Sequence, residues 1–203
     1  MSISGDKTGI AGVWIKHKYV TQEDELPSKS LFYRTAFAVA VKAPKGAQIS
    51  FEKNKQFIYW LREQGFNVKK VTADTFQSAA VLQDLRAHNF DCDIQSVDRL
   101  TGEGKNKICE PYHYFRTTVY DGRIETFKHT LLTEEIVSLE KLSDGHIDHP
   151  QNGSKDTSDA VCGAIFEASK HAEEFAYDYG EDLVTTVQIS QSVSEGDTVS
   201  KAF

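Results

Sequence analysis

An alternation of strand-like and helix-like segments between residues 9 and 177 constrains the fold of this chain more than any other feature. Strand-like segments, rich in β-branched and aromatic residues, are predicted at residues 9–18, 31–41, 68–72, 93–97 and 123–127. Helix-like segments, with apolar residues on one face, are predicted at residues 51–64, 76–88, 111–120, 133–142 and 156–177. Such an alternation predicts an α/β domain with a mixed β-sheet that helices cover on both faces.

The end of the chain differs from the rest in composition. Residues 173–203 carry seven acidic residues and one lysine, so most of the net charge of -7 lies there. Beyond about residue 180 the sequence is rich in Ser, Thr and Val and lacks helical periodicity. We therefore expect one domain over residues 1–179 and a flexible acidic tail over residues 180–203. A short strand over residues 184–189 is the alternative for part of this tail.

Several classes of protein are excluded by motifs that the sequence lacks. No apolar run reaches the length of about 18 residues that marks a membrane-spanning helix, and the N-terminus does not resemble a signal peptide. The three cysteines are widely spaced and do not suggest a disulfide framework or a zinc site. Neither a P-loop nor a Gly-x-Ser-x-Gly motif is present. A reducing cytoplasm and no membrane partner are therefore expected.

The candidate catalytic residues are acids that follow a strand or open a helix. Asp74 comes directly after the strand predicted at 68–72, where an α/β sheet gathers its chemistry. Asp156 and Asp159 open the last helix and lie one turn apart. For these three acids the alternative is capping of a helix N-terminus, which needs no function. Asp6 lies in a turn before the first strand, and a turn residue is the alternative there.

Carboxylates that are remote in sequence but adjacent in space suit one kind of chemistry. Mg²⁺ and Mn²⁺ prefer hard oxygen ligands. Two such ions about 4 Å apart can hold a scissile phosphate, activate a water molecule and neutralise the leaving oxygen. The acids named above are therefore candidate ligands of a two-metal site.

A series of motifs in a fixed order adds to this interpretation. The motifs are Asp74-Thr-Phe-Gln-Ser78, Ser96-Val-Asp98-Arg99, Pro111-Tyr112, Asp121-Gly-Arg-Ile124, Gly145-His-Ile-Asp-His-Pro150 and Gly153-Ser-Lys-Asp156-Thr-Ser-Asp159-Ala160. In this order they resemble the C-terminal nuclease domain of the tailed-bacteriophage terminase large subunit. The resemblance runs from about Ser4 to Lys170, which is most of the chain. Asp-x-Phe-Gln-Ser followed by Ile-Asp-His-Pro and Gly-Ser-Lys-Asp-x-x-Asp-Ala is a specific combination, whereas either part alone is moderate evidence.

The resemblance implies an RNase H-like fold and a metal-dependent endonuclease. In that family the domain cuts concatemeric viral DNA during genome packaging, with Mg²⁺ or Mn²⁺ held by three acids. Asp74 and Asp159 match two of these acids, and Asp156 lies where family members carry a supporting polar residue. The implied partners are double-stranded DNA, the terminase ATPase domain, the small terminase subunit and the portal. The implied location is the cytoplasm of the infected bacterial host.

The sequence departs from the family pattern at its start. The family's first catalytic Asp lies on an opening strand upstream of the segment that matches Ser4-Gly-Asp6, so this acid and part of its strand are expected to be missing. Asp6 is the nearest carboxylate and is the candidate to replace it as a metal ligand. The alternative is a catalytically incomplete fragment that only binds DNA or packaging partners.

Basic residues between the predicted elements are candidates for contacts with DNA phosphates. They are Lys105, Lys107, Arg123 and Lys128. A solvated surface charge is the alternative for each of them, because charged side chains are mostly exposed whatever the function.

Overall fold

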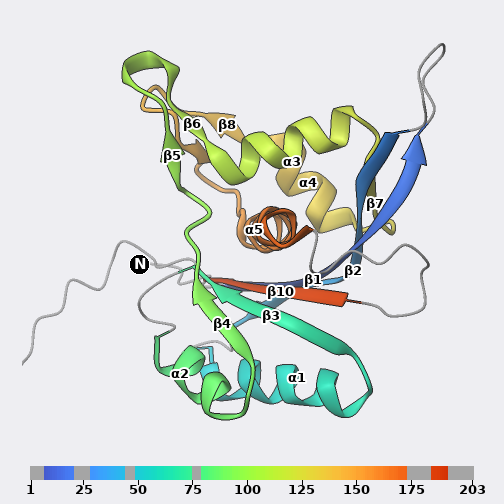
Figure 1. Ribbon diagram of the computed structural model, residues 1–203. Coiled ribbons are helices and arrows are strands. Elements are labelled where there is room, and N and C mark those ends of the chain that lie inside the picture. Colours follow the sequence, from blue (N-terminus) through green and yellow to red (C-terminus); the bar gives the residue numbers. More distant parts are fainter. Residues whose placement is uncertain (1–6, 21–27, 44–48, 75–78, 173–183, 192–203) are drawn as a thin grey trace, which may run out of the picture.

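The structure, a computed structural model, describes residues 7–20, 28–43, 49–74, 79–172 and 184–191. Its centre is a six-stranded sheet (Figure 1). From one edge to the other, the strands are β4 (Asp91–Ile94), β3 (Asn67–Ala73), β10 (Val184–Gln191), β1 (Lys7–Val20), β2 (Ser28–Lys42) and β7 (Ile124–Glu125). β1 is antiparallel to β10 and β2, whereas the β10–β3, β3–β4 and β2–β7 pairs are parallel. The sheet is therefore mixed, as the sequence predicts.

Helices cover both faces of this sheet, which confirms the expected layering (Figure 1). One face carries α1 (Phe51–Glu63) and α2 (Ala79–Ala87). The other face carries α5 (Asp156–Lys170), and α3 (Glu110–Tyr120) and α4 (Thr130–Ser138) lie over α5. Two further sheets have two strands each: β5 (Leu100–Thr101) with β6 (Ile108–Cys109), and β8 (Glu140–Lys141) with β9 (Ile147–Asp148). None of the helices in the described ranges has the length and apolar character needed to cross a membrane.

Alternate residues of β1 are buried in two different cores. Ala11, Val13 and Ile15 pack in the core that contains α5, whereas Ile10 packs in the core that contains α1 and α2. Successive side chains of a strand point to opposite faces of the sheet, so a strand between two helical layers is apolar on both. This explains why residues 9–15 of β1 form a continuous run without charged or polar side chains.

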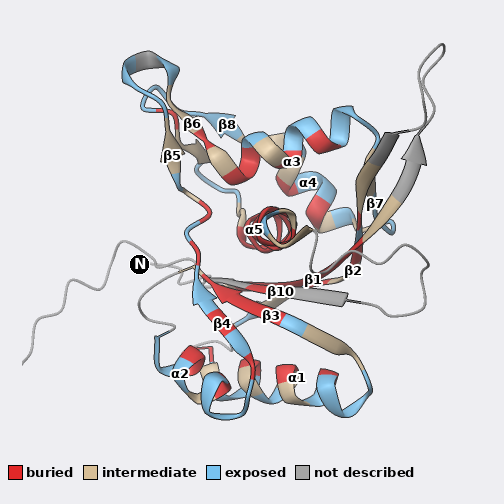
Figure 2. Cartoon of the chain, in the orientation of Figure 1, coloured by how far each residue is buried: buried red, intermediate tan, exposed pale blue. Residues whose placement is uncertain are grey.

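Helix α5 is the most deeply buried element of the described chain. All of its residues from Asp156 to Ala168 are buried, and Figure 2 shows it enclosed between the sheet and the outer helices. Small residues such as Ala160, Gly163 and Ala164 let the neighbouring layers approach closely. The acids in the first turn of α5 consequently lie inside the protein.

The expected flexible tail over residues 180–203 is wrong for residues 184–191, and the strand alternative is confirmed. These residues form β10, which lies between β1 and β3 and pairs with both along six register positions. Without β10, the facing sides of β1 and β3 would be two unpaired edges inside the sheet. Pairing of those edges outweighs the polar composition of the segment. Residues 192–203 lie outside the described part of the chain.

Other predicted boundaries are shifted. The helix expected at residues 133–142 begins at Thr130, where the Nδ1 atom of the preceding His129 accepts a hydrogen bond from the Leu132 N–H at 3.0 Å. It ends at Ser138, because the chain then turns into β8 and pairs with β9. The strand expected at residues 93–97 is β4, which ends at Ile94 and pairs with β3.

Candidate functional site

Three aspartates lie near one end of the sheet. Asp74 directly follows β3, Asp98 lies beyond the end of the adjacent parallel strand β4, and Asp159 lies in the first turn of α5. The charges of Asp74 and Asp98 both act on Asp159. The carboxyl ends of parallel strands share one edge of a sheet, so the position of Asp74 and Asp98 follows from the topology.

Asp74 is held by the loop that follows β4. Its Oδ1 atom accepts a hydrogen bond from the Val97 N–H at 3.2 Å. Burial raises the pKa of Asp74, and the nearby charge of Asp98 adds to this, although the hydrogen bond from Val97 works in the opposite direction. Val97 lies in the loop after β4, so this contact is not a helix cap. Residues 75–78, between Asp74 and α2, lie outside the described part of the chain.

Asp159 is almost enclosed, with 7% of its surface exposed. The hydroxyl group of Tyr112 on α3 donates a hydrogen bond to its Oδ1 atom at 2.5 Å. Burial raises the pKa of Asp159 well above its usual value, and the Lys155 charge and the Tyr112 hydrogen bond offset this only in part. A further positive charge nearby would therefore stabilise the ionised form of Asp159.

Lys155 supplies positive charge at the centre of the site. Its Nζ atom donates hydrogen bonds to Asp98 Oδ1 at 2.9 Å and to the Ile147 carbonyl oxygen at 3.0 Å. Burial lowers the pKa of Lys155, but the carboxylates of Asp159 and Asp98 outweigh burial and raise it overall. One ammonium group thus faces three carboxylates, and the site keeps an excess of negative charge.

Asp156 has different partners from Asp159, although the two lie on the same turn. The Ser154 hydroxyl lies 3.0 Å from Asp156 Oδ2 and 2.8 Å from Glu135 Oε1. Glu135 Oε2 also accepts a hydrogen bond from the Ser158 N–H at 2.8 Å. Asp156 is therefore grouped with residues that join α4 to the start of α5. The N-cap position of α5 is Lys155, so the capping alternative for Asp156 is wrong by one residue.

The donor set of this site fits a hard divalent cation by atom type, because carboxylate oxygens are the ligands that Mg²⁺ and Mn²⁺ prefer. Burial raises the pKa of Asp74 and of Asp159, so a cation beside them would stabilise their ionised forms. Within the described ranges, however, no three His, Cys, Asp or Glu side chains are grouped as metal ligands. Asp6, the expected third ligand, lies outside those ranges.

The four basic residues predicted to contact DNA have different environments. Arg123 makes an ion pair with Asp121 at 2.8 Å and donates to the Leu31 carbonyl oxygen at 3.3 Å, so it fastens the start of β7 to β2. Lys128 is exposed and Lys107 is partly buried. The side chain of Lys105 is outside the described part of the structure.

Asp98, Lys155 and Tyr112 lie within the sequence motifs but were not predicted as site residues, and Glu135 lies outside those motifs. A signal existed for Asp98, because it follows the strand next to β3, where a carboxylate can reach the same edge. Lys155 was visible only as the neighbour of Asp156. Tyr112 and Glu135 act through contacts between helices that no local pattern records.

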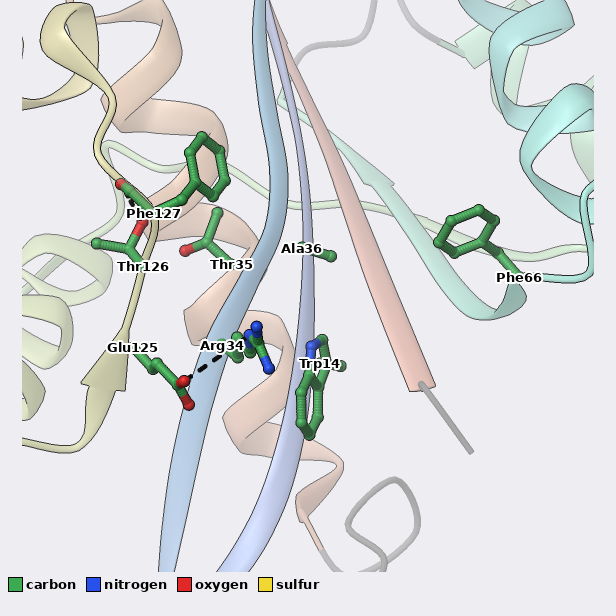
Figure 3. Close-up of a pocket in the computed structure, with 8 residues that line it drawn as sticks. All are labelled: Trp14, Arg34, Thr35, Ala36, Phe66, Glu125, Thr126 and Phe127. Atoms are coloured by element: carbon green, nitrogen blue, oxygen red, sulfur yellow. Dashed lines mark hydrogen bonds and ion pairs between the residues drawn. The ribbon is translucent and has the colours of Figure 1, made fainter. Parts of the chain in front are cut away.

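A cavity of about 370 Å³ lies away from these acids, beside the edge of β2 (Figure 3). Arg34 and Glu125 form an ion pair of 3.9 Å in it, and Arg34 also lies over the Trp14 ring, 5.6 Å from its centroid. The other residues of its lining are Thr35, Ala36, Phe66, Thr126 and Phe127. None of the acids or basic residues predicted for function lines this cavity, so the carboxylate site remains the candidate for chemistry.

The fold and this site define a mixed α/β protein with a carboxylate cluster at one end of its central sheet. No protein-family model, curated protein or solved structure matches the chain. The function is therefore inferred from the site and from the motifs of the sequence.

Asp159→Asn is expected to stabilise the folded chain at neutral pH. An acid with a raised folded-state pKa favours unfolding, because its unfolded form ionises at about pH 3.9. The penalty is absent below that pH and grows as pH rises toward the folded-state pKa, by about 1.4 kcal/mol per pKa unit of difference. The variant keeps an oxygen for Tyr112 and removes the penalty. Thermal unfolding should show a Tm higher by about 2–4 °C per kcal/mol at pH 7, and little change at pH 4.

The matched control for this prediction is Glu63→Gln, which removes an exposed carboxylate on α1. Its Tm should follow that of the unaltered chain at both pH values. A lower Tm of Asp159→Asn at pH 7 would mean that the ionised carboxylate stabilises the fold, contrary to the expected sign.

Proposed function

We propose that this chain is an RNase H-like, metal-dependent endonuclease domain related to the nuclease domain of phage terminase large subunits. It would hydrolyse phosphodiester bonds in double-stranded DNA and cleave concatemeric viral DNA during genome packaging. Its partners would be a terminase ATPase domain, a small terminase subunit and a portal, in the cytoplasm of an infected bacterium. These assignments rest on the order of the sequence motifs together with the carboxylate site.

The observation that carries this proposal is that Asp74 and Asp159 lie close enough for the charge of one to act on the other. They are 85 positions apart in the sequence, yet the charge of Asp74 acts on Asp159 at the end of one sheet. The motif order independently matches the same two acids to metal ligands of the terminase nuclease family. Their shared location, with Asp98 beside them, is what a metal-dependent nuclease needs.

The topology of the sheet also supports an RNase H-like arrangement. In the family that the motifs resemble, the opening strand is central in the sheet. Here the central position between β1 and β3 is taken by β10, which is antiparallel to β1 and parallel to β3. A strand from the other end of the chain thus occupies this central position, and its Gln188 is buried.

In this proposal Asp74 and Asp159 hold Mg²⁺ or Mn²⁺, with Asp98 as a third carboxylate in reach of the same charge. When bound, such an ion stabilises negative charge on a phosphate and makes a water molecule a better nucleophile. Tyr112 fixes the carboxylate of Asp159 through its hydrogen bond, and Val97 fixes that of Asp74. Asp156 acts on the start of α5 through Ser154 and has a supporting role.

Nicking of supercoiled plasmid DNA tests this proposal. The purified chain should nick the plasmid in Mn²⁺ or Mg²⁺ and should not do so in EDTA. Asp74→Asn should lower the rate by at least about 100-fold, because it removes a ligand charge needed in the transition state. The Glu63→Gln variant, altered on the far side of the sheet, should nick at an unchanged rate.

The alternative is a domain that binds DNA or packaging partners without cutting. The lack of three grouped acids in the described ranges favours this alternative. A folded chain that retards DNA in a gel but does not nick it with either metal would establish the alternative. Nicking that persists in Asp74→Asn would refute the assignment of the site.

A further inference from the structure

A second cavity, of about 260 Å³, lies between the outer helices and the edge of the central sheet. Helices α3, α4 and α5 and strands β2 and β7 contribute to its lining. The lining consists of seven apolar residues and three threonines: Phe115, Val119, Ile124, Leu132, Ile136, Val137, Val161, Thr35, Thr126 and Thr133. No charged residue is among these described residues. This cavity, called here the apolar cavity, therefore suits an uncharged and mainly apolar occupant.

The apolar cavity is open to solvent at its rim and closed at its inner wall. Val119 on α3 is 48% exposed and Val137 on α4 is 80% exposed, whereas Phe115, Leu132 and Val161 are buried. A ligand can thus enter from the surface and bury an apolar body against the core. An apolar cavity of about 150 Å³ is large enough to hold benzene, so 260 Å³ admits a six-membered ring with a substituent.

One hydroxyl group in the lining has no hydrogen-bond partner. Thr35 is only 3% exposed, and its Oγ1 atom makes no hydrogen bond within the described part of the chain. By contrast, the Thr133 hydroxyl donates to the His129 carbonyl oxygen at 3.1 Å, and the Thr126 hydroxyl donates to the Phe127 carbonyl oxygen at 3.4 Å. Figure 3 shows the side chain of Thr35 pointing from β2 toward Thr126, which lines the same cavity. A buried hydroxyl without a partner is costly, so a ligand that bonds to it gains affinity.

We propose that the apolar cavity binds a small, uncharged, mainly apolar molecule that carries one hydroxyl or carbonyl group, and that Thr35 Oγ1 is the partner of that group. The apolar body of the ligand packs on the inner wall of Phe115, Leu132 and Val161. A threonine hydroxyl can donate or accept, so it serves either group. This inference does not depend on the proposed nuclease function, because no acid of the carboxylate site lines the apolar cavity.

Binding of p-cresol and p-xylene to the full chain tests this inference, because these molecules differ only in a hydroxyl group in place of a methyl group. NMR titration, followed through the methyl signals of Val119, Ile136 and Val137, gives both affinities. In Thr35→Val, the affinity for p-cresol relative to p-xylene should fall by at least about fivefold, the factor that one hydrogen bond contributes. Thr133→Val is the matched control, because it makes the same change in the same lining at a hydroxyl that is already bonded. It should alter this ratio by less than about twofold.

Three results would overturn the inference. The first is that neither molecule shifts these methyl signals up to its solubility limit. The second is that both bind but their relative affinity is the same in the unaltered chain and in Thr35→Val. The third is that the signals move only with the concentration of the chain, which would make the apolar cavity a contact between copies. Should Thr35→Val fail to fold, as judged by circular dichroism, Thr35→Ala removes the same hydroxyl and should change the ratio in the same direction.

Discussion

Gln188→Pro is expected to unfold the domain, because it breaks the strand that joins the two halves of the sheet. Gln188 lies opposite Ala11 of β1 and Thr72 of β3, so its backbone is paired on both sides. Proline has no N–H to donate, and in a central strand it is excluded for that reason. The side chain of Gln188 is fully buried and accepts hydrogen bonds from Thr72 Oγ1 and from Gln95 Nε2. The combined loss should be at least about 3 kcal/mol, a large part of the stability of a single domain.

Gln188→Met is the matched variant for this test. It keeps the backbone of β10 and a side chain of similar length, and it removes the amide group whose oxygen accepts from Thr72 and Gln95. It should cost about 1–3 kcal/mol and leave a folded chain. Urea unfolding followed by circular dichroism gives both values. A Gln188→Pro chain that unfolds at the same urea concentration as the unaltered chain would mean that β10 is not part of the stable sheet.

The difficulty of predicting β10 has a physical cause. Its sequence, Val184-Thr-Thr-Val-Gln-Ile-Ser-Gln191, has few large apolar residues and follows an acidic segment, so local composition favours a solvated tail. What makes it a strand is the presence of two strand edges, β1 and β3, that are built from residues far away in the sequence. By contrast, β1 and α1 were predictable from local sequence, because the apolar residues of each follow the spacing of its buried positions. The end of α1 was predictable from Gly65, which adopts a φ of 87° just beyond the helix.

The site shows the same division between local and long-range information. Asp74 was predictable from its position after a strand, and Asp159 from its position in the first turn of a long helix. Asp98 and Lys155 join them through contacts across the fold, so spacing alone does not reveal their role. The nuclease assignment remains a prediction, because it rests on a motif order and a charge arrangement.

Gly9→Ala is expected to destabilise the chain by about 3 kcal/mol, through a clash between β1 and α5. A Cβ atom at Gly9 would lie 1.9 Å from the carbonyl oxygen of Asp156 and 3.0 Å from the Thr157 nitrogen. Both are backbone atoms in the first turn of a buried helix, so no side chain can rotate away to make room. Relief requires the start of α5 to move away from the sheet.

That movement would displace Asp159, because Asp159 lies in the same turn of α5. We therefore expect Gly9→Ala to lose Mn²⁺ affinity even at temperatures where circular dichroism shows the chain still folded. Lys7→Ala, on the same strand and two residues earlier, adds no volume and should change the free energy of unfolding by less than about 0.5 kcal/mol. A Gly9→Ala chain with unaltered stability would mean that α5 lies farther from β1 than in this structure. Unaltered stability together with unaltered Mn²⁺ binding would remove the link between strand packing and the carboxylates of the site.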